Sequence, residues 1–538
     1  MGKKIICLIA VLCMALGFAA CSGNTTIASD SGTDMKGGFV AETKDYVYFI
    51  NGVESYSTAY KTGKVTKGAL MRVAKSKFGS ETPADYETVV SKLIVSDDTS
   101  AGFYISGDYV YYAVPSTENN RKGETKKDQL LFFRTKLDAS STSSKISDKD
   151  FSHDAKFRFV ANGSEVYLVV YSTNVYVYDA VNGGEIMNTE DTKYADLQNK
   201  ARRGTVQEVM FDEDNAAPVV YYTYKPIDVS RWQDETSATA EKYYDVHKIT
   251  LGGGKATDVI AVNGFGRTTK PNNPELSDVI EDEEMIGLTF DLLRHKNGKL
   301  FYSQTSLNTN VSAVIYKTMD DKTGARTVVT YATPKTTAAF ADTVKIRSIS
   351  EAGDKVETMY VDSTLGLVKF DSSKANDESA DSDFGVNVIS DKEDLKKATV
   401  RFISKEGDVE YLYYTNSDGN YYKISLTALE AGEDTEALRV NTLSLNTSWY
   451  TPEVVNVNGK YFFVCVYSDS AYKSYVYAID MSEIEKGVKA VKEEKGDDFA
   501  ESDYYSYNKK KTEDAVKLGK KLGVLAEADV EKDSTTSK

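Results

Sequence analysis

A pair of aromatic strands joined by a turn recurs through most of this chain. Residues 410–426, EYLYYTNSDGNYYKISL, show the pattern most clearly. Tyr411–Tyr414 are aromatic and favour a β-strand. Asn416-Ser417-Asp418-Gly419 favour a turn, because Asn, Asp and Gly tolerate positive φ. Residues 421–426 then alternate polar and apolar side chains, so the stretch predicts a β-hairpin.

The first strand of this pattern occurs eight times between about Phe39 and Ile484, at spacings of roughly 50 to 80 residues. Its copies are YVYFI (46–50), YVYYA (109–113), VYLVVY (166–171), VVYYTY (219–224), KLFYS (299–303), VETMYV (356–361), EYLYY (410–414) and YFFVCVY (461–467). The return strands read LMRVAK, LFFRTKLD, VYVYDA, VHKITL, VIYKTMD, LVKFD, YYKISL and YVYAID. A further strand precedes several units, as in KFRFVANG, TVRFISKEG and PEVVNVNG, and RTVVTYA follows the fifth.

Four short antiparallel strands per unit, repeated in series, are typical of β-propeller blades. The sequence therefore predicts an all-β fold over residues 39–484, a β-propeller of eight, alternatively seven, four-stranded blades. The period exceeds the ~40–45 residues of compact propeller families, so we expect long loops between strands. A pair of β-sandwiches or a β-solenoid is the alternative architecture.

The composition is typical of antiparallel sheets with one face in water, and the net charge argues against some classes of binding partner. The chain contains 37 Tyr, and a tyrosine ring can pack while its hydroxyl reaches water. The formal net charge is −16, which argues against a nucleic-acid partner because such binding rests on neutralised phosphates. It argues equally against a broad electrostatic attraction to anionic membranes.

The N-terminus predicts export. Lys3 and Lys4 precede an apolar stretch of 14 residues, 5–18, which is shorter than the ~20 residues of a spanning helix. Phe18-Ala19-Ala20-Cys21 resembles the lipobox of bacterial lipoproteins, although Phe18 stands where Leu is usual. The resemblance implies a signal peptide at 1–20 and lipidation of Cys21 on an extracytoplasmic membrane face. An ordinary secretory signal is the alternative.

Three further segments complete the expected organisation. Residues 21–38 are rich in Ser, Thr, Gly and Asp and predict a flexible tether. Residues 485–538 form a charged tail, within which 509–532 predict a short amphipathic helix weakened by Gly519 and Gly523. This helix would cap the last blade or contact a membrane or partner through its lysines.

The propeller units resemble two known kinds of repeat. The aromatic strand, turn and Lys-containing return strand are similar to secreted bacterial propellers of the YWTD low-density-lipoprotein-receptor type, although YWTD itself is absent. Residues 175–188, VYVYDAVNGGEIMN, are similar to a quinoprotein repeat but lack its closing Trp, so no quinone is implied. Outer-membrane assembly lipoproteins share the plan of a lipid anchor and a propeller.

No familiar catalytic motif stands in the sequence. Gly-x-Ser-x-Gly, His-Glu-x-x-His, Cys-x-x-Cys and a phosphate-binding loop are absent. His153, His247 and His295 lie in different units without metal-ligand spacing, and the acidic clusters lack the order of a calcium loop. Cys465 lies in an apolar strand and is expected to be a buried core residue. We therefore expect no bound metal and no cofactor.

The most suggestive local feature is the insert at residues 225–242, KPIDVSRWQDETSATAEK, which interrupts the hairpin of the fourth unit. It carries Trp232, one of two tryptophans, beside Arg231. Long loops on a rigid scaffold often carry function, and Trp and Arg are enriched at binding hot spots. Arg231 and Trp232 are thus the candidate binding residues, unless Trp232 folds back over its blade.

These observations predict a lipid-anchored scaffold at the cell envelope that binds a protein or a saccharide without performing chemistry. One alternative is a glycan-acting hydrolase or lyase whose site lies at the propeller axis. Another is an envelope assembly factor.

Overall fold

The structure is a computed structural model of the whole chain. The described residues are 32–51, 68–78, 85–90, 93–94, 102–116, 129–138, 142–152, 154–172, 174–189, 205–212, 218–225, 244–265, 290–296, 299–305, 314–320, 326–331, 345–349, 356–363, 365–371, 386–441, 451–457, 459–470 and 473–505. Within them the chain is mostly β, with strands arranged in eight sheets of three to six strands. The chain divides into two compact units, residues 1–153 with 446–478 and 513–538, and residues 154–445 with 479–512.

The first unit contains three sheets. One has the order β2 (Val40–Glu42), β3 (Tyr46–Asn51), β4 (Ala69–Ala74), β5 (Tyr86–Val90). The second has the order β1 (Gly32–Gly37), β6 (Phe103–Gly107), β7 (Tyr109–Pro115), β8 (Gln129–Lys136), β10 (Phe151–Ser152), with β9 (Ser144–Lys145) also on β8. The third is β31 (Glu453–Val457), β32 (Lys460–Ser470) and β33 (Lys473–Asp480). The strand β1 occupies part of the segment 21–38 that was expected to be a tether.

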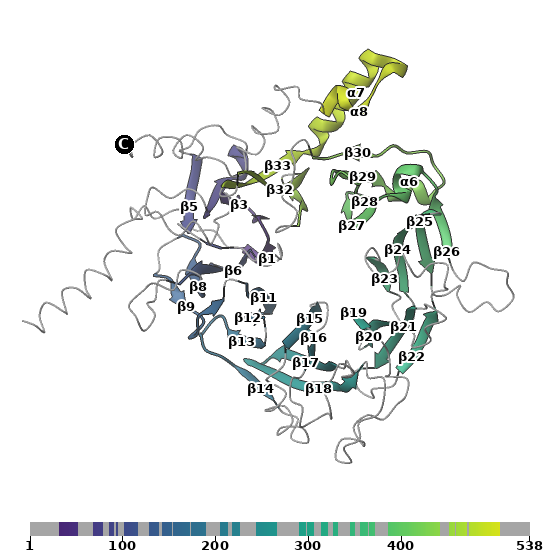
Figure 1. Cartoon of the computed structure of the whole chain (residues 1–538). Coiled ribbons are helices and arrows are strands. Elements are labelled where there is room, and N and C mark those ends of the chain that lie inside the picture. Colours follow the sequence, from purple (N-terminus) through teal and green to yellow (C-terminus); the bar gives the residue numbers. More distant parts are fainter. Residues whose placement is uncertain are drawn as a thin grey trace, which may run out of the picture. The chain divides into compact units, whose positions relative to one another are not determined.

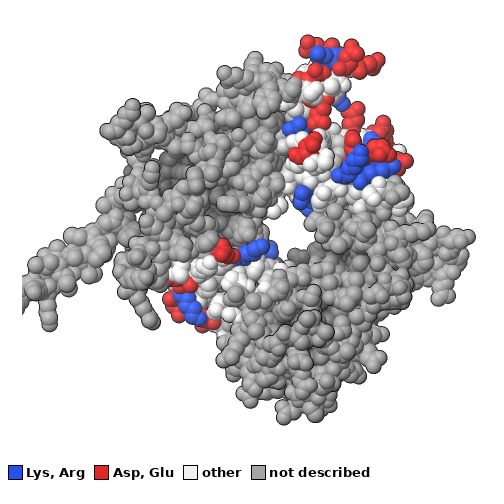
Figure 2. All heavy atoms as spheres, in the orientation of Figure 1, with Lys and Arg blue, Asp and Glu red and all other residues white. Residues whose placement is uncertain are grey.

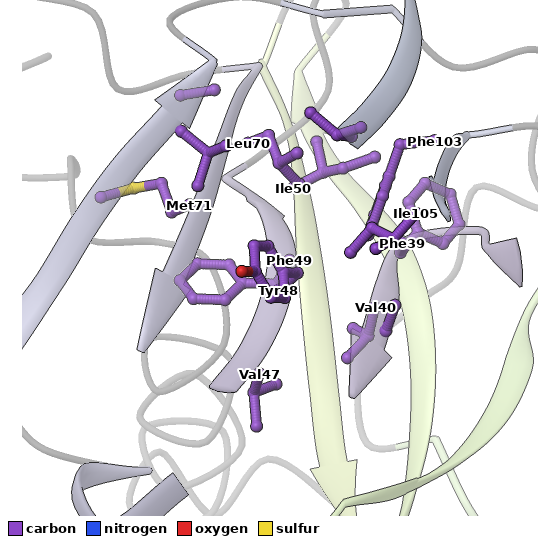
Figure 3. Packing of buried hydrophobic residues seen from close by; sticks show 14 of the residues in the cluster. Phe39, Val40, Val47, Tyr48, Phe49, Ile50, Leu70, Met71, Phe103 and Ile105 are labelled. Carbon is purple, nitrogen blue, oxygen red and sulfur yellow. The ribbon is translucent and has the colours of Figure 1, made fainter. Parts of the chain in front are cut away.

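The core of the first unit joins all three sheets. Phe39 and Phe49 of the first sheet, Phe103 and Ile105 of β6, and Val464 of β32 are buried in one apolar cluster, part of which Figure 3 shows. Each Å² of apolar surface that is removed from water stabilises the folded state by about 25 cal/mol. The earliest and the latest sheet of the chain are therefore stabilised by the same core.

A buried carboxyl group reinforces this junction between β2 and β31. The backbone N–H of Phe39 donates to Glu453 Oε1 at 3.0 Å. Burial raises the pKa of Glu453 to about 7, although the backbone N–H groups of Phe39 and Val40 oppose that rise. The contact thus holds an ionisable group where its charge is poorly solvated.

The second unit contains five sheets. The first is β11 (Lys156–Asn162), β12 (Glu165–Tyr171), β13 (Val175–Asp179), and the second has the order β14 (Met187–Thr189), β18 (Lys255–Phe265), β17 (Tyr244–Gly252), β16 (Val219–Lys225), β15 (Thr205–Asp212). The third is β19 (Phe290–Lys296), β20 (Lys299–Thr305), β21 (Val314–Asp320), β22 (Arg326–Tyr331), and the fourth is β23 (Lys345–Ile349), β24 (Val356–Asp362), β25 (Gly366–Asp371), β26 (Val386–Ser390). The fifth is β27 (Thr399–Glu406), β28 (Val409–Thr415), β29 (Tyr421–Ser425), β30 (Leu438–Arg439).

Neighbouring strands in these five sheets run antiparallel, except that β14 lies parallel to β18 at the edge of its sheet. The first strands of successive sheets also lie next to one another, in the order β15, β19, β23, β27 (Figure 1). Apart from β14, the strands follow chain order within each sheet, and this order combined with the contacts of β15, β19, β23 and β27 is the local arrangement that a radial stack of sheets requires.

The recurring hairpins share a side-chain rule. Tyr48, Tyr111 and Tyr413 of the second strands stand directly opposite a cationic residue of the third strands. The partners are Arg72, Arg134 and Lys423, respectively, and each lies over the ring of the tyrosine two residues earlier, Tyr46, Tyr109 or Tyr411, at 4.0, 4.6 and 4.3 Å. The Tyr-x-Tyr sequence therefore places one aromatic ring against the cation and a second tyrosine directly opposite it in the ladder.

Helices follow some of the sheets. They are η2 (Lys75–Lys77), α5 (Glu393–Lys396), α6 (Leu426–Glu430), α7 (Met481–Lys495), η7 (Gly496–Asp498) and α8 (Glu501–Tyr505). Asp480 caps α7 by accepting from the N–H of Ser482 at 3.0 Å. Tyr504 of α8 packs against Gly487 of α7, where a Cβ would meet the ring at 2.6 Å. Among the described residues, no helix combines the length and apolarity needed to cross a bilayer.

The eight hairpins predicted from sequence are confirmed, because each aromatic strand is an inner strand of its own sheet and pairs with its return strand. Helix α7 was not predicted. Residues 1–20 and the helix expected at 509–532 lie outside the described residues. The structure thus shows a mostly-β chain of antiparallel sheets, and their closure into a propeller is taken up below as a proposal.

Replacing Glu453 by Gln should make stability less dependent on pH. The pKa of Glu453 is higher in the folded state than its ordinary 4.5, so the folded state favours the protonated form. Its contribution is most favourable below about pH 4.5 and is lost as pH rises through about 7. We expect Glu453→Gln to gain about 1–3 kcal/mol over wild type between pH 5 and pH 8.

Urea unfolding at the two pH values measures this difference. Asp45→Asn, at an exposed position of the same unit, is the matched control and should leave the pH dependence unchanged. Equal pH dependence in wild type and Glu453→Gln would contradict the account of this junction.

Candidate functional site

The candidate site is the end of the five-stranded sheet from which the predicted binding insert departs. Strands β16 and β17 pair antiparallel, and the last pair of their ladder joins Tyr224 and Asp245. Residues 226–243 therefore connect two neighbouring strand ends. That segment, with Arg231 and Trp232, lies outside the described residues.

A buried polar network lies two residue pairs from this end. The hydroxyl of Tyr222 in β16 donates to Asp258 Oδ2 at 2.9 Å, and His247 Nδ1 in β17 lies 3.1 Å from Asp258 Oδ1 in β18. The ring of Tyr222 stacks on that of His247, with centroids 4.5 Å apart. None of the three residues is more than 5% exposed.

Register explains why these residues meet. Tyr222 and His247 are directly opposite each other, and Asp258 is opposite Ile249, one diagonal step from His247. Their surroundings are apolar, since Tyr222 and Ile249 belong to a core cluster shared with the preceding sheet. A buried carboxyl group is costly unless it is hydrogen-bonded, and Tyr222 and His247 each place a polar atom within hydrogen-bond distance of one of the two Asp258 oxygens.

The same end of the sheet is irregular on both flanks. Gln207 is an extra residue in β15 opposite β16, and Ala261 is an extra residue in β18 opposite β17. A second irregularity of β18 falls between Val262 and Phe265. Bulges strengthen local twist and are common beside functional sites. The hydrogen-bonded network of Tyr222, His247 and Asp258 therefore lies next to the irregular end of this sheet, from which residues 226–243 depart.

The chemistry of Tyr, His and Asp is that of acid–base catalysis, but this arrangement is enclosed. A general base must come within hydrogen-bond reach of the proton it abstracts. Side chains at most 5% exposed in the middle of a packed sheet offer no such approach. We read the three residues as positioning residues that fix β16, β17 and β18 relative to one another.

The other residues singled out from sequence are distributed as follows. Cys21, His153 and the segment 281–284 lie outside the described residues, and His295 belongs to β19, in a different sheet from His247. Cys465 is 1% exposed in β32, and burial raises its pKa to about 12, so its thiol stays protonated and unreactive. In the described part of the chain, no group of three His, Cys, Asp or Glu residues could hold a metal ion.

Sequence reasoning named His247 only as one of three histidines without metal-ligand spacing, and it missed Tyr222 and Asp258. The available signal was the single Asp inside the otherwise strand-like KATDVIAV, residues 255–262. A carboxylate within an apolar strand requires a partner on a neighbouring strand, and the histidine of the preceding strand supplies it.

Comparisons with known proteins yield no family. No protein-family model matches the chain, and no curated protein matches its sequence. Among solved structures, the chain is similar to the computationally designed Ika8 protein at 8% identity, covering 84% of this chain and 98% of that one, with a TM-score of 0.35. It is similar to the Cps50 (Swd1) β-propeller domain of Myceliophteria thermophila at 10% identity, covering 68% and 97%, with a TM-score of 0.32.

A third similar structure is an oligogalacturonate lyase in complex with manganese, at 9% identity, covering 71% of this chain and 94% of that one, with a TM-score of 0.35. These TM-scores are below 0.5, so nothing about fold or activity is transferred from these proteins.

Replacing Asp258 by Ala should destabilise the second unit. The change leaves the buried hydroxyl of Tyr222 and Nδ1 of His247 without their acceptor, which we expect to cost about 2–4 kcal/mol. Asp258→Asn, which keeps one acceptor oxygen, should lose less, and Lys255→Ala at an exposed position of the same strand should be neutral. Urea unfolding followed by far-ultraviolet circular dichroism measures these differences. A loss for Asp258→Ala no greater than that of Lys255→Ala would refute the structural role of the network.

Proposed function

We propose that this chain is a lipid-anchored β-propeller on an extracytoplasmic membrane face that binds a protein or saccharide partner through residues 226–243. The observation that carries the proposal is the pairing of β16 with β17 up to Tyr224 and Asp245. Because the strands pair to this point, the eighteen residues between them depart from a single fixed end of the sheet.

Three features support a propeller architecture. The sheets of the second unit follow the chain, and their first strands contact one another in sequence. In the first unit, the sheet that begins with β2 and the sheet that begins with β31 share one core, as closure of a ring would require. Radial closure would also protect the many aromatic strands from pairing with other chains.

The composition of residues 226–243 supports binding. Trp and Arg are the side chains most enriched at the energetic centres of interfaces, and Arg231 and Trp232 are adjacent. A connection of this length between two paired strands is uncommon unless it has a function. The buried network of Tyr222, His247 and Asp258 supplies the rigid base that such a loop needs for specificity.

Loss of Trp232 should abolish partner binding without loss of fold. We expect mature protein to retain a specific protein or polysaccharide from detergent-solubilised bacterial envelope, and Trp232→Ala to recover at least ~10-fold less of it, consistent with a hot-spot residue worth 2 kcal/mol or more. Gln233→Ala, the adjacent residue, is the matched control.

Quantitative mass spectrometry and glycan analysis of the eluates provide the readout. Equal recovery by wild type and Trp232→Ala would remove Trp232 from the binding site. Turnover of an envelope polysaccharide by wild type would replace the binding proposal with the glycan-acting enzyme.

Cys21 should determine membrane attachment. Expressed with its own leader in a bacterial host, the wild-type protein should incorporate radiolabelled palmitate and partition into the detergent phase of Triton X-114. Cys21→Ser should do neither, because the thiol is the group acylated in bacterial lipoproteins that the leader resembles. Equal palmitate incorporation by Cys21→Ser, or an unlabelled wild type, would exclude lipidation at this residue.

A further inference from the structure

A row of three facing residues in the first sheet shows how this chain holds a buried arginine. Tyr48 of β3 stands directly opposite Arg72 of β4, and Arg72 stands directly opposite Glu87 of β5. The guanidinium of Arg72 lies over the ring of Tyr46 at 4.0 Å, and its Nε donates to Glu87 Oε2 at 2.8 Å. The face of the guanidinium thus contacts an aromatic ring while its edge binds a carboxylate.

The sheet that contains β7 and β8 repeats this row without the carboxylate. Tyr111 of β7 stands directly opposite Arg134 of β8, and Arg134 stands directly opposite Ser144 of β9. The guanidinium of Arg134 lies over the ring of Tyr109 at 4.6 Å, which repeats the aromatic contact of the first sheet. A serine therefore occupies the position that a glutamate has in the other row.

The guanidinium of Arg134 has no acidic partner among the described residues. Residues 139–143 of the connection from β8 to β9 read ASSTS and contain no carboxylate. Arg134 and Tyr109 are half-buried, whereas Ser144 is exposed. A small ligand can therefore approach the guanidinium from the side on which the first sheet carries its glutamate.

A third example of the arrangement does have its acid. Lys423 of β29 lies over the ring of Tyr411 at 4.3 Å, and its ammonium pairs with Glu406 at 2.8 Å. Partly burying a cation is costly unless an anion compensates for the lost hydration. Arg134 is thus the member of this set whose compensating anion the described part of the chain does not supply.

The surroundings favour a compact anion over a long polyanion. Lys and Arg side chains are interspersed with Asp and Glu on the described surface (Figure 2), and the whole chain carries a net charge of −16. Attraction between exposed charges is screened beyond roughly 8 Å at physiological salt. An anion is therefore held here by direct contact with the guanidinium and not by a broad positive surface.

We propose that Arg134, Tyr109 and Ser144 form a subsite that binds a carboxylate group of a small ligand. Because the ring of Tyr109 covers one face of the guanidinium, the N–H donors in its plane stay available for two carboxylate oxygens. The hydroxyl of Ser144 is exposed beside them and can donate to the same ligand. The ligand is a carboxylic acid, either free or as the acidic group of a sugar.

This subsite is independent of the proposed partner site. Arg134 belongs to the first unit, whereas residues 226–243 fall within the second unit. Trp232→Ala should therefore leave carboxylate binding unchanged, and either proposal can fail without the other.

Isothermal titration calorimetry with three probes tests the subsite. Glutarate represents a free acid, the disaccharide of glucuronic acid and N-acetylglucosamine represents a sugar acid, and N,N′-diacetylchitobiose is the neutral control. We expect the wild-type protein to bind at least one of the two acids in low-salt buffer and to leave the neutral sugar unbound. Arg134→Gln should weaken binding at least ~10-fold, because it removes the charge-assisted donors.

Lys145→Gln is the matched control for charge. Lys145 stands opposite Phe133, so it lies on the other face of the sheet, and its loss changes net charge by the same amount. It should bind both acids as the wild type does.

Ser144→Glu tests the same geometry in the opposite direction, because it restores the acid that the first sheet has. The added carboxylate should pair with Arg134, weaken binding of either acid at least ~10-fold and raise the calorimetric melting temperature. It should not raise the melting temperature when combined with Arg134→Gln. Ser144→Gln, which has the same size without the charge, should bind nearly as the wild type does.

Each outcome is decisive. Preference for the disaccharide over glutarate would identify a sugar acid, and the reverse a free acid. Failure of the wild type to bind either acid, or binding by Ser144→Glu as tight as that of the wild type, would overturn the proposal. Equal weakening by Lys145→Gln and Arg134→Gln would overturn it too, since net charge alone would then explain the loss. Circular dichroism of each variant confirms that its fold is retained.

Discussion

Pairing of the second strand with the third strand in each sheet is the constraint on which the rest of the structure depends. In each described sheet the second strand is hydrogen-bonded on both edges, and runs of consecutive buried residues in several of these strands show that both of their faces are covered as well. In β12, five consecutive residues from Val166 to Val170 are buried. A sheet with two apolar faces is unstable alone and needs a neighbour on each side.

The first two sheets of the second unit show how such neighbours are joined. Asn162 Nδ2 donates to the carbonyl of Leu251, and the N–H of Gly253 donates to Glu165 Oε2 at 3.1 Å. Both contacts lie at hairpin turns, where Gly253 adopts a φ of +64°. Turn-to-turn hydrogen bonds between stacked sheets fix their relative position along the strands without adding a charged group to the core.

Aromatic rings around a facing cation then select one register for each hairpin. A slip of one residue would place Arg72 opposite Val47 or Phe49 instead of Tyr48, and would move it to the other face of the sheet. A cation–π contact contributes only about 0.5–2 kcal/mol. The cost of burying an unpaired guanidinium is several times larger, so the arrangement excludes wrong registers more strongly than it stabilises the right one.

Hairpins were predictable from sequence because their information is local. Residues 410–426 contain both strands and the turn, where Asn416 Oδ1 accepts from the N–H groups of Asp418 and Asn420. The parallel pairing of β14 with β18 was not predictable, since Met187 and its partner Ala256 lie 69 positions apart (256 − 187), far beyond the spacing of a hairpin.

The residues that pair there, Met187 and Ala256, belong to different hairpin units, so no local pattern joins them.

The candidate site was likewise predictable from sequence only in part. Periodicity located the insert at residues 225–242 and the strand that contains His247, because both are features of one short stretch of chain. Asp258 was missed because its partners, Tyr222 and His247, come from two other strands, and only the register of the folded sheet brings them together. Bulges such as those at Gln207 and Ala261 shift the hydrophobic alternation by only one residue, and their strands of 8 and 11 residues are too short for that shift to stand out.

Residues 226–243 join β16 to β17, which are neighbouring strands of one sheet. The network of Tyr222, His247 and Asp258 ties β16, β17 and β18 together but includes no residue of β15. The strand ends from which residues 226–243 depart are therefore fixed by buried hydrogen bonds between side chains as well as by the ladder between β16 and β17.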